Sequence, residues 1–283
     1  MNALPELREL SLRCLEILDP DDKAAAVRQL AGQTPKPDPR RRLMPTGALP
    51  GRPTRPALVS PTQVPSRGVN TSASRGVLMH ALAHIEFNAI NLALDAIWRF
   101  DGMPDAYYWD WFTVAREETY HFGLLQDYLR KQGLRYGDYD AHDGLWQMAD
   151  KTRDDPLARM ALVPRTLEAR GLDASPPLRA KLWAAGDRDG AEILDIILRD
   201  EIGHVAIGNR WYHYLCKQAG LDPVPTYAAL TARYQAPILR GPFNFPARKA
   251  AGFTDEELTA LEQAAADAAP RKPSRAGTAE FSH

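Results

Sequence analysis

The sequence predicts an all-α protein built around a four-helix bundle. Four long segments, 71–100, 105–132, 154–171 and 187–219, place apolar residues three and four positions apart, the period of a helix with one buried face. Each segment also carries a glutamate on its apolar stripe, and in the second and fourth that glutamate begins a Glu-x-x-His motif. Together these observations predict helices that meet around a shared polar centre.

The composition is that of a soluble globular protein. The 283 residues are 45% hydrophobic and 25% charged, and 35 basic against 36 acidic side chains give a formal net charge of -1. This balance argues against a protein that coats nucleic acid or a membrane surface. No run approaches the ~20 apolar residues that span a bilayer. Because the first residues also lack an apolar signal core, we expect a cytoplasmic protein with no membrane partner.

The N-terminal part, residues 1–70, is expected to pack on the bundle. Residues 3–30 have helical spacing with a break at an Asp-Pro-Asp-Asp sequence, where Asp21 or Asp22 is expected to cap a second helix starting near Lys23. The only two cysteines, Cys14 and Cys216, lie far apart in the chain. They exclude a disulfide scaffold and a CxxC metal site, so we expect two buried or half-buried thiols.

A proline-rich, basic arm follows. Residues 35–65 hold nine of the 23 prolines, a density at which no regular helix forms. An extended arm packed over the domain surface is the first interpretation, and a cationic contact for phosphate or nucleic acid is the alternative. The basic residues are Lys36, Arg40, Arg41, Arg42, Arg52, Arg55 and Arg67.

The bundle is expected to span 71–219. Its second and third helices are joined by a long connection, 133–153, in which 144–151 is expected to be helical. Pro164 is expected to kink the third helix and Gly171 to end it.

A C-terminal extension is expected over 220–268. It should be irregular up to residue 253 and then form a helix over 254–268 capped by Thr254. The remaining residues, 269–283, are expected to be disordered.

The glutamates on the apolar stripes are candidates for metal ligands. A lone buried carboxylate without a partner costs several kcal/mol. Four such carboxylates carry four negative charges, which two divalent cations neutralise, and two neutral imidazoles complete the donor set. The predicted ligands, in chain order, are Glu86, Glu118, His121, Glu168, Glu201 and His204.

The spacing of these residues supports the prediction. Glu118–His121 and Glu201–His204 are both i, i+3 pairs, which share one helical face. Di-iron and di-manganese carboxylate bundles have a known arrangement of ligands: two helices supply one glutamate each, and the other two supply one Glu-x-x-His pair each. Across antiparallel helices, we expect Asp200 to orient His121 and Glu117 to orient His204.

The sequence resembles an uncharacterised, mainly bacterial family of ferritin-like proteins, known only as a domain of unknown function. The resemblance covers nearly the whole chain to about residue 260. It implies a ferritin-like four-helix bundle with a di-metal centre, and the six residues above match its expected ligands. It implies no established reaction. The stretches that carry it are PGRPTRPALV, HALAHIEFNAINLALDAIWRF, VAREETYHF, YGDYDAHDGLW, RMALVPRTLEARGLD, ILRDEIGHVAIGNRWY and GPFNFPARKAAGF.

Oxygen and imidazole donors favour iron or manganese. We expect two Fe, with Fe/Mn or two Mn as alternatives, in an oxidoreductase that uses O₂ to oxidise or hydroxylate an unknown organic substrate. Glu118 and Glu201 are expected to bridge the metals, and Glu86 and Glu168 to be terminal ligands. The bundle is also similar in architecture to tRNA-modifying di-iron hydroxylases and to bacterial multicomponent monooxygenases, so the substrate is expected to be a small molecule or tRNA, with an electron-donor protein as a further partner.

Residues around the metals are expected to form a dry cavity and select the substrate. The expected cavity walls are Ile90, Trp111, Phe122 and Leu198. The candidate substrate-binding residues are Arg165, Arg170, Asn244 and Arg248, although for each an ordinary structural contact is the simpler interpretation. The YGDYDAHDGLW loop either covers the cavity or is an ordinary crossover.

Two other classes of function stay open. One is iron handling or peroxide detoxification without an organic substrate, ferroxidase-like or di-manganese catalase-like. The other is a metal-stabilised module that binds RNA through the arginine-rich arm. The spaced pair His80 and His84 is a weak candidate for an additional metal site, because Glu86 lies on a different face from His84.

Overall fold

The computed structural model describes residues 6–33 and 35–268, and the prediction of an all-α protein is confirmed. In this part of the chain the only β contacts are two isolated bridges, Glu6 with Lys36 and Leu58 with Ala141. The helices are α1 (Leu7–Glu16), α2 (Pro20–Ala31), α3 (Ser72–Arg99), α4 (Asp105–Lys131), α5 (Gly144–Lys151), α6 (Pro156–Leu162), the π-helix η1 (Val163–Glu168), α7 (Ala169–Ala184), α8 (Arg188–Ala219), α9 (Pro223–Arg233), α10 (Phe245–Ala250) and α11 (Asp255–Asp267).

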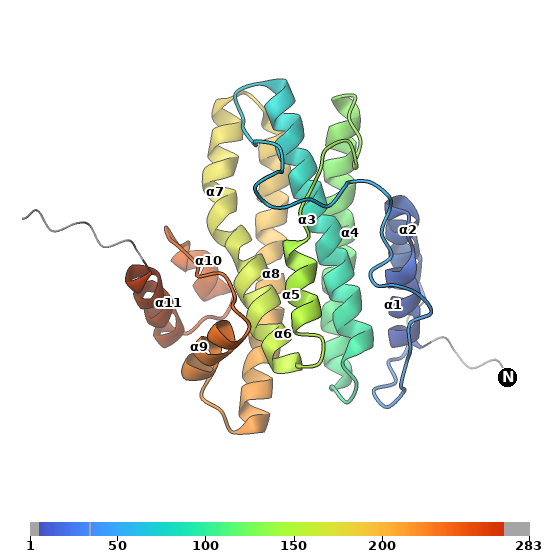
Figure 1. Ribbon diagram of the computed structural model, residues 1–283, viewed down its shortest axis with the longest axis vertical. Helices are drawn as coiled ribbons and strands as arrows, with labels where there is room; N and C mark the ends of the chain where they lie inside the picture. Colours follow the sequence, from blue (N-terminus) through green and yellow to red (C-terminus); the bar gives the residue numbers. More distant parts are fainter. Residues whose placement is uncertain (1–5, 34, 269–283) are drawn as a thin grey trace, which may run out of the picture.

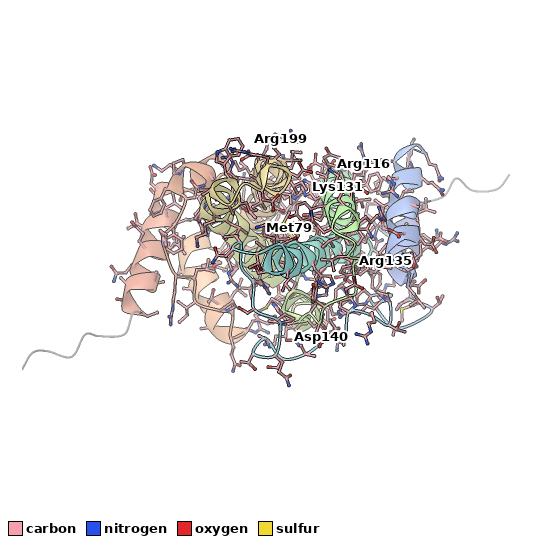
Figure 2. The ribbon with its side chains drawn as sticks, turned by 90° about the horizontal axis from the view of Figure 1, so that it is seen from above. Met79, Arg116, Lys131, Arg135, Asp140 and Arg199 are labelled. Carbon is pink, nitrogen blue, oxygen red and sulfur yellow. The ribbon has the colours of Figure 1, made fainter. Side chains whose placement is uncertain are left out.

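Four long helical segments lie side by side: α3, α4, the continuous run α6–η1–α7, and α8 (Figure 1). Short turns join α3 to α4 and α7 to α8, and within each of these pairs the helices pack along each other. The connection from α4 to α6 is long and contains α5. Seen along the helices, α1 and α2 lie outermost on one side, and the C-terminal helices on the other (Figure 2).

Capping residues begin several of these helices. Asp19, and not Asp21 or Asp22, caps α2: it accepts hydrogen bonds from the Asp21 and Asp22 amides, and the helix starts at Pro20, three residues before Lys23. Thr254 caps α11 as expected, and Glu257 completes a capping box with it.

The third segment corrects the sequence-based boundary. Gly171 does not end the helix, because the run continues to Ala184 through two prolines. Gly186, with a φ of 80°, adopts the left-handed conformation just beyond that end. The two missing proline N–H donors are tolerated because α7 packs along α8, with Leu172 and Leu182 fully buried.

The proline-rich arm is not helical, as expected, and it packs on the helices (Figure 1). The Arg8 guanidinium donates to the carbonyls of Asp38 and Arg41, which ties the arm to α1. Further along, Arg52 forms a 2.6 Å ion pair with Asp143, just before α5. The arm is therefore fixed to the helices near its start and at its middle.

The C-terminal extension is more regular than expected. Residues 220–253 contain α9, which begins with Pro223, and α10, whose second residue is Pro246. A helix tolerates proline in its first turn. The expected disorder of 269–283 concerns residues outside the described ranges.

The most apolar helix is α3. By length and composition α3 alone, among the described helices, is long and apolar enough to cross a membrane, with a mean hydropathy of 1.3 over its best window. This result limits the expectation that no segment is long and apolar enough to span a bilayer. However, 78% of that window is buried inside the protein, as in the core helix of a soluble fold.

Cys14 and Cys216 are both buried and unpaired.

Candidate metal centre

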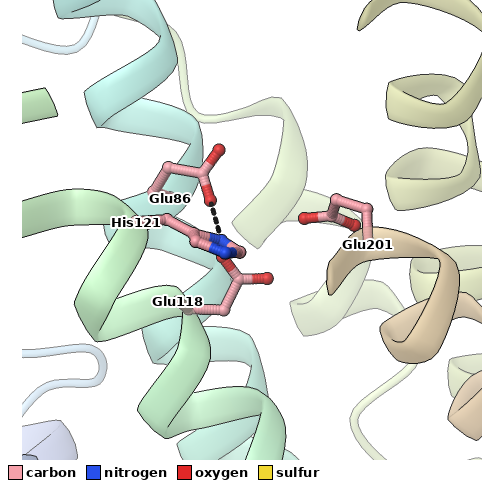
Figure 3. A group of neighbouring side chains, drawn as sticks. All are labelled: Glu86, Glu118, His121 and Glu201. Carbon is pink, nitrogen blue, oxygen red and sulfur yellow. Dashed lines mark ion pairs between the residues drawn. The ribbon is translucent and has the colours of Figure 1, made fainter. Parts of the chain in front are cut away.

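The glutamates and histidines of the four long segments meet inside the protein. Single ligand atoms of Glu86, Glu118, His121 and Glu201 lie within 4.8 Å of one another, and all four residues are buried (Figure 3). Glu86 comes from α3, Glu118 and His121 from α4, and Glu201 from α8. The group therefore joins three helices and could hold metal ions.

The other two residues of the predicted set lie against this group. His204 Nδ1 is 3.0 Å from Glu118 Oε1 and 3.6 Å from Glu201 Oε1. Glu168, the last residue of η1, lines the same cavity as Glu86 and Glu201. All six residues singled out in the sequence thus gather at one place.

Each of the six residues presents a buried polar atom that no hydrogen-bond donor or acceptor of the described residues satisfies. Such atoms are rare in folded proteins, because an unpaired buried polar group costs about 1–3 kcal/mol. A cation in their midst would satisfy all of them. The atoms are Glu86 Oε2, Glu118 Oε1 and Oε2, His121 Nδ1, Glu168 Oε2, Glu201 Oε2 and His204 Nδ1.

Two carboxylates from opposite helices hold the imidazoles. His121 Nε2 lies 3.1 Å from Asp200 Oδ2, and His204 Nε2 lies 2.8 Å from Glu117 Oε2. With the Nε2 proton donated outward, Nδ1 of each ring is left as a lone-pair donor facing the glutamates. Arg199 lies on the outer side of α8 (Figure 2). Its side chain pairs with Asp200 at 2.7 Å.

Burial and mutual charge set the protonation of the cluster without metal. Burial first, and then the negative charge of Glu118, raise the pKa values of Glu86 and Glu201. Burial and the charges of Glu201 and Glu118 likewise raise the pKa of Glu168 well above its usual range.

The pKa values of Glu118 and of the two histidines shift in the directions that favour their charged forms. Burial opposes ionisation of Glu118, but the charge of His204 and the proximity of both imidazoles outweigh it and hold the Glu118 pKa well below its usual range. Burial also disfavours charged His121, yet its contacts with Glu118 and Glu86 raise the His121 pKa to about 11. These shifts favour protons on Glu86, Glu168, Glu201 and the histidines of the metal-free cluster, and bound cations would displace them.

We expect the outward hydrogen bonds to tune metal affinity. Replacing Asp200 by Asn or Glu117 by Gln removes the charged acceptor that holds one imidazole, and should weaken metal binding about 10- to 100-fold. Competition with a chelator of known affinity measures the change. Glu192→Gln, an exposed substitution elsewhere on α8, is the matched control and should bind as the wild type does.

The π-helix positions Glu168. Pro164 cannot donate an amide hydrogen bond, and instead of a simple kink the chain widens over Val163–Glu168, where the Thr166 hydroxyl donates to Ala161 O at 2.8 Å. Such wide turns are frequent at functional sites. Pro164 packs on α8 at Gly208, where an added Cβ would lie 2.5 Å from Pro164 Cβ.

Gly208→Ala is therefore expected to destabilise the metal-free protein by about 1–3 kcal/mol, because it overpacks this contact. Urea unfolding in the presence of EDTA measures the change. Gly203→Ala is the matched control on α8, since its Cβ would meet nothing within 4 Å, and it should stabilise by up to about 1 kcal/mol. Equal unfolding of Gly208→Ala and wild type would show that the contact is not tight.

A cavity of about 710 Å³ borders the cluster, with Glu86, Glu168 and Glu201 in its wall. The YGDYDAHDGLW loop covers part of it through Tyr139, His142 and neighbouring residues. The expected wall residues were wrong. Ile90, Trp111 and Phe122 are packed in the main hydrophobic core, and Leu198 packs against a second cluster near α10.

Three of the four candidate substrate-binding residues are engaged in structural contacts. Arg165 is buried and pairs with Glu257 at 2.7 Å. Arg248, also buried, pairs with Asp173 at 2.6 Å, while Asn244 caps α10 and donates to Leu172 O. A fourth, Arg170, lines the cavity and is exposed.

Histidines outside the cluster have ordinary partners. The His84 ring lies 2.9 Å from the Tyr136 hydroxyl and 3.1 Å from His142 O. His80 Nε2 accepts from the Gly137 amide at 2.8 Å. These contacts use ring nitrogens that a second metal site would need.

Comparison with known proteins identifies the family without adding an activity. An uncharacterized protein of Haemophilus influenzae is 49% identical to this chain over 223 residues, covering 76% of this chain and 77% of that protein. No solved structure matches the chain. The family model described as protein of unknown function (DUF455) matches residues 16–259. The chain therefore belongs to the DUF455 family.

Proposed function

We propose that the protein is a dinuclear-metal oxidoreductase, with two iron ions as the first expectation, that uses O₂ to oxidise or hydroxylate an organic substrate. The observation that carries the proposal is the set of unpaired, buried polar atoms on all six glutamate and histidine residues. We infer that Glu86, Glu118, His121, Glu168, Glu201 and His204 are the metal ligands.

The arrangement of helices supports a ferritin-like bundle. The two Glu-x-x-His motifs lie on α4 and α8, and the two single glutamates lie on α3 and in the α6–η1–α7 run. Di-iron and di-manganese carboxylate bundles draw their ligands from four helices in this way. The pairing of α3 with α4 and α7 with α8, joined by one long connection, agrees with a bundle that has one crossover.

The donor set supports iron or manganese. Four carboxylates and two imidazoles would balance two divalent cations, and such donors suit iron and manganese better than the soft ions that thiolates select. Neither cysteine is near enough to belong to the group of ligand atoms. Two Fe is the first proposal, with Fe/Mn and two Mn as alternatives.

Two ferrous ions bound here would supply electrons to O₂, whose reduction would provide the oxidant for a nearby substrate. The chain's own groups would set the conditions for that chemistry. Glu118 touches both imidazoles, so it is the proposed bridging ligand, together with Glu201. Glu86 and Glu168 border the cavity and are proposed terminal ligands. Asp200 and Glu117 would keep the ring tautomers fixed.

The cavity favours an organic substrate over peroxide or iron alone. A volume of about 710 Å³ lies within the ~300–1,000 Å³ of small-molecule sites, far beyond what O₂ or peroxide needs. The RNA-binding alternative draws less support, since Arg41 pairs with Glu9 and Arg52 with Asp143.

Oxygen consumption tests the proposal. Protein loaded anaerobically with Fe²⁺ is expected to consume O₂ in an electrode chamber in proportion to its bound iron, and Glu118→Gln, which we expect to lack the site, should consume none beyond free-iron oxidation. A manganese-loaded sample that turns over peroxide would favour the catalase-like alternative. Iron-loaded protein that neither consumes O₂ nor turns over peroxide would contradict the proposal.

A further inference from the structure

Three arginines line the cavity that borders the metal cluster. Arg67 comes from the end of the proline-rich arm, Arg170 from the first turn of α7, and Arg240 from the segment between α9 and α10. All three are exposed, although they contribute to the cavity lining. Segments far apart in the sequence thus place like charges around one cavity.

These arginines have no acidic partner among residues 6–33 and 35–268. Most buried arginines of this protein are paired, as Arg159 is with Asp95 and Arg248 with Asp173, but no carboxylate lies within 4.0 Å of Arg67, Arg170 or Arg240. Asp140 and Asp173 also line the cavity, but neither forms an ion pair with these arginines, and Asp173 pairs with Arg248. Like charges that are not paired repel one another. An anion bound between them would remove that repulsion.

His142 lines the same cavity as Arg67 and Arg170. Burial first, and then the charges of both Arg67 and Arg170, lower the His142 pKa. His142 belongs to the loop that covers the cavity, and its Nδ1 accepts from the Gly144 amide at 3.2 Å. The loop, the arm and α7 therefore bring an imidazole and two guanidinium groups to the wall of one cavity.

The rest of the lining is mainly apolar. Leu78, Ala89, Leu194 and Ile197 are buried residues of the wall, and Ile238, 58% exposed, lies at its outer part. The carboxylates of Glu86, Glu168 and Glu201 form the polar patch on the bundle side. The cavity thus combines exposed cations, an apolar wall and the cluster that we propose to hold metals.

We propose that the substrate of this site is an amphipathic organic anion. A carboxylate or phosphate group would bind Arg67, Arg170 and Arg240, and an apolar body would extend along the buried wall toward the cluster. This inference rests on the proposed metal centre, because the atom to be oxidised would be the one that lies nearest to it. Guanidinium groups bind both anions through paired, charge-assisted hydrogen bonds.

The charges also give the bound molecule an orientation. Glu86, Glu168 and Glu201, together with Glu118, would neutralise two bound divalent cations, so that the net positive charge of the cavity wall lies at the three arginines. The polar end is therefore held away from the cluster, and the apolar end is directed to it.

Calorimetric titration of metal-loaded protein with decanoate, decyl phosphate, decanol and decylammonium tests the charge requirement. At least one anion is expected to bind ten or more times as tightly as the alcohol and the amine, and comparison of the two anions identifies the preferred group. Arg67→Gln/Arg170→Gln/Arg240→Gln should lose roughly tenfold or more of that affinity. Equal binding of anions and alcohol, or an unchanged triple variant, would overturn the proposal.

A charge-matched control separates local contact from net charge. Arg28, Arg42 and Arg135 are exposed and do not line the cavity, and their guanidinium groups have no carboxylate within 4.0 Å among the described residues. The corresponding triple glutamine variant should bind the anions as the wild type does. If it loses the same affinity, a general charge effect explains binding and the anion site is overturned.

The orientation of the bound anion is tested by a separate measurement. A decanoate whose terminal methyl is replaced by CF₃ should give a ¹⁹F resonance that broadens in manganese-loaded protein and not in metal-free protein. Metal content is measured on the same samples. Loaded protein that binds anions no better than alcohol overturns only the anion site, whereas protein that binds anions through the arginines but takes up no metal overturns the proposed function.

Discussion

Glu118→Gln is expected to abolish the stabilisation that bound metal gives to the fold. At free metal concentrations about a thousandfold above the dissociation constant, each occupied site should add about 4 kcal/mol to the free energy of unfolding of the wild type. Glu118 contacts both imidazoles, with Oε1 3.0 Å from His204 Nδ1 and Oε2 3.5 Å from His121 Nδ1, and both oxygens are buried and unpaired. Its loss should therefore disable both metal positions.

Urea unfolding with Mn²⁺ and with EDTA measures this effect. The wild type should unfold at a higher urea concentration with Mn²⁺, and Glu118→Gln should unfold at the same concentration in both conditions. Glu192→Gln, exposed on α8, controls for the loss of one negative charge and should keep the metal-dependent shift. A Glu118→Gln variant that gains as much stability from Mn²⁺ as the wild type would contradict the assignment.

Asp95→Asn is expected to destabilise the fold by about 3–5 kcal/mol, because it leaves a buried arginine without its counter-charge. Asp95 is fully buried and pairs with Arg159, which is 1% exposed, and with Arg99 at 2.6 Å. Arg159 also donates to Thr152 and to Ala149 O, so it cannot turn to solvent without breaking those bonds.

The pH dependence of unfolding provides an independent readout of this pair. Burial opposes ionisation of Asp95, but the charges and hydrogen bonds of Arg159 and Arg99 lower its pKa. A folded pKa below the unfolded one stabilises the protein above pH ~4, and that stabilisation is lost as the pH falls through the folded value. Asp95→Asn should therefore lose less stability in acid than the wild type.

Two comparisons make the Asp95 prediction specific. Asp127→Asn removes one partner of the exposed Arg130 pair and should change stability by less than about 1 kcal/mol. Asp95→Leu/Arg159→Met removes both buried charges and should recover most of the loss. If Asp95→Asn costs no more than Asp127→Asn, the buried pair does not hold α3 against α6.

The candidate site could be predicted from the sequence because its residues lie on regular helices. A glutamate in an apolar stripe stands out against the helical period, and a histidine three positions later shares its face. The same regularity led to the expected partners Asp200 and Glu117, each of which lies one position before a motif and forms a hydrogen bond across to the other helix.

Features that depend on tertiary contact could not be predicted from the sequence. The end of α7 depends on packing against α8, which outweighs the helix-breaking tendency of Pro176 and Pro177. Arg165 and Arg248 lie near the motifs in sequence, but their buried acidic partners are distant in the chain. Conversely, Arg67 and Arg240 reach the cavity from segments that have no helical period to analyse.

The central claim is that the four glutamates and two histidines hold two metal ions. Protein purified without added metal should be analysed by inductively coupled plasma mass spectrometry, beside a Glu118→Ala/Glu201→Ala variant whose folding is checked by circular dichroism. The account predicts two iron or manganese ions per wild-type chain and none in the variant. A folded wild type that takes up neither metal, even after anaerobic reconstitution, would contradict it.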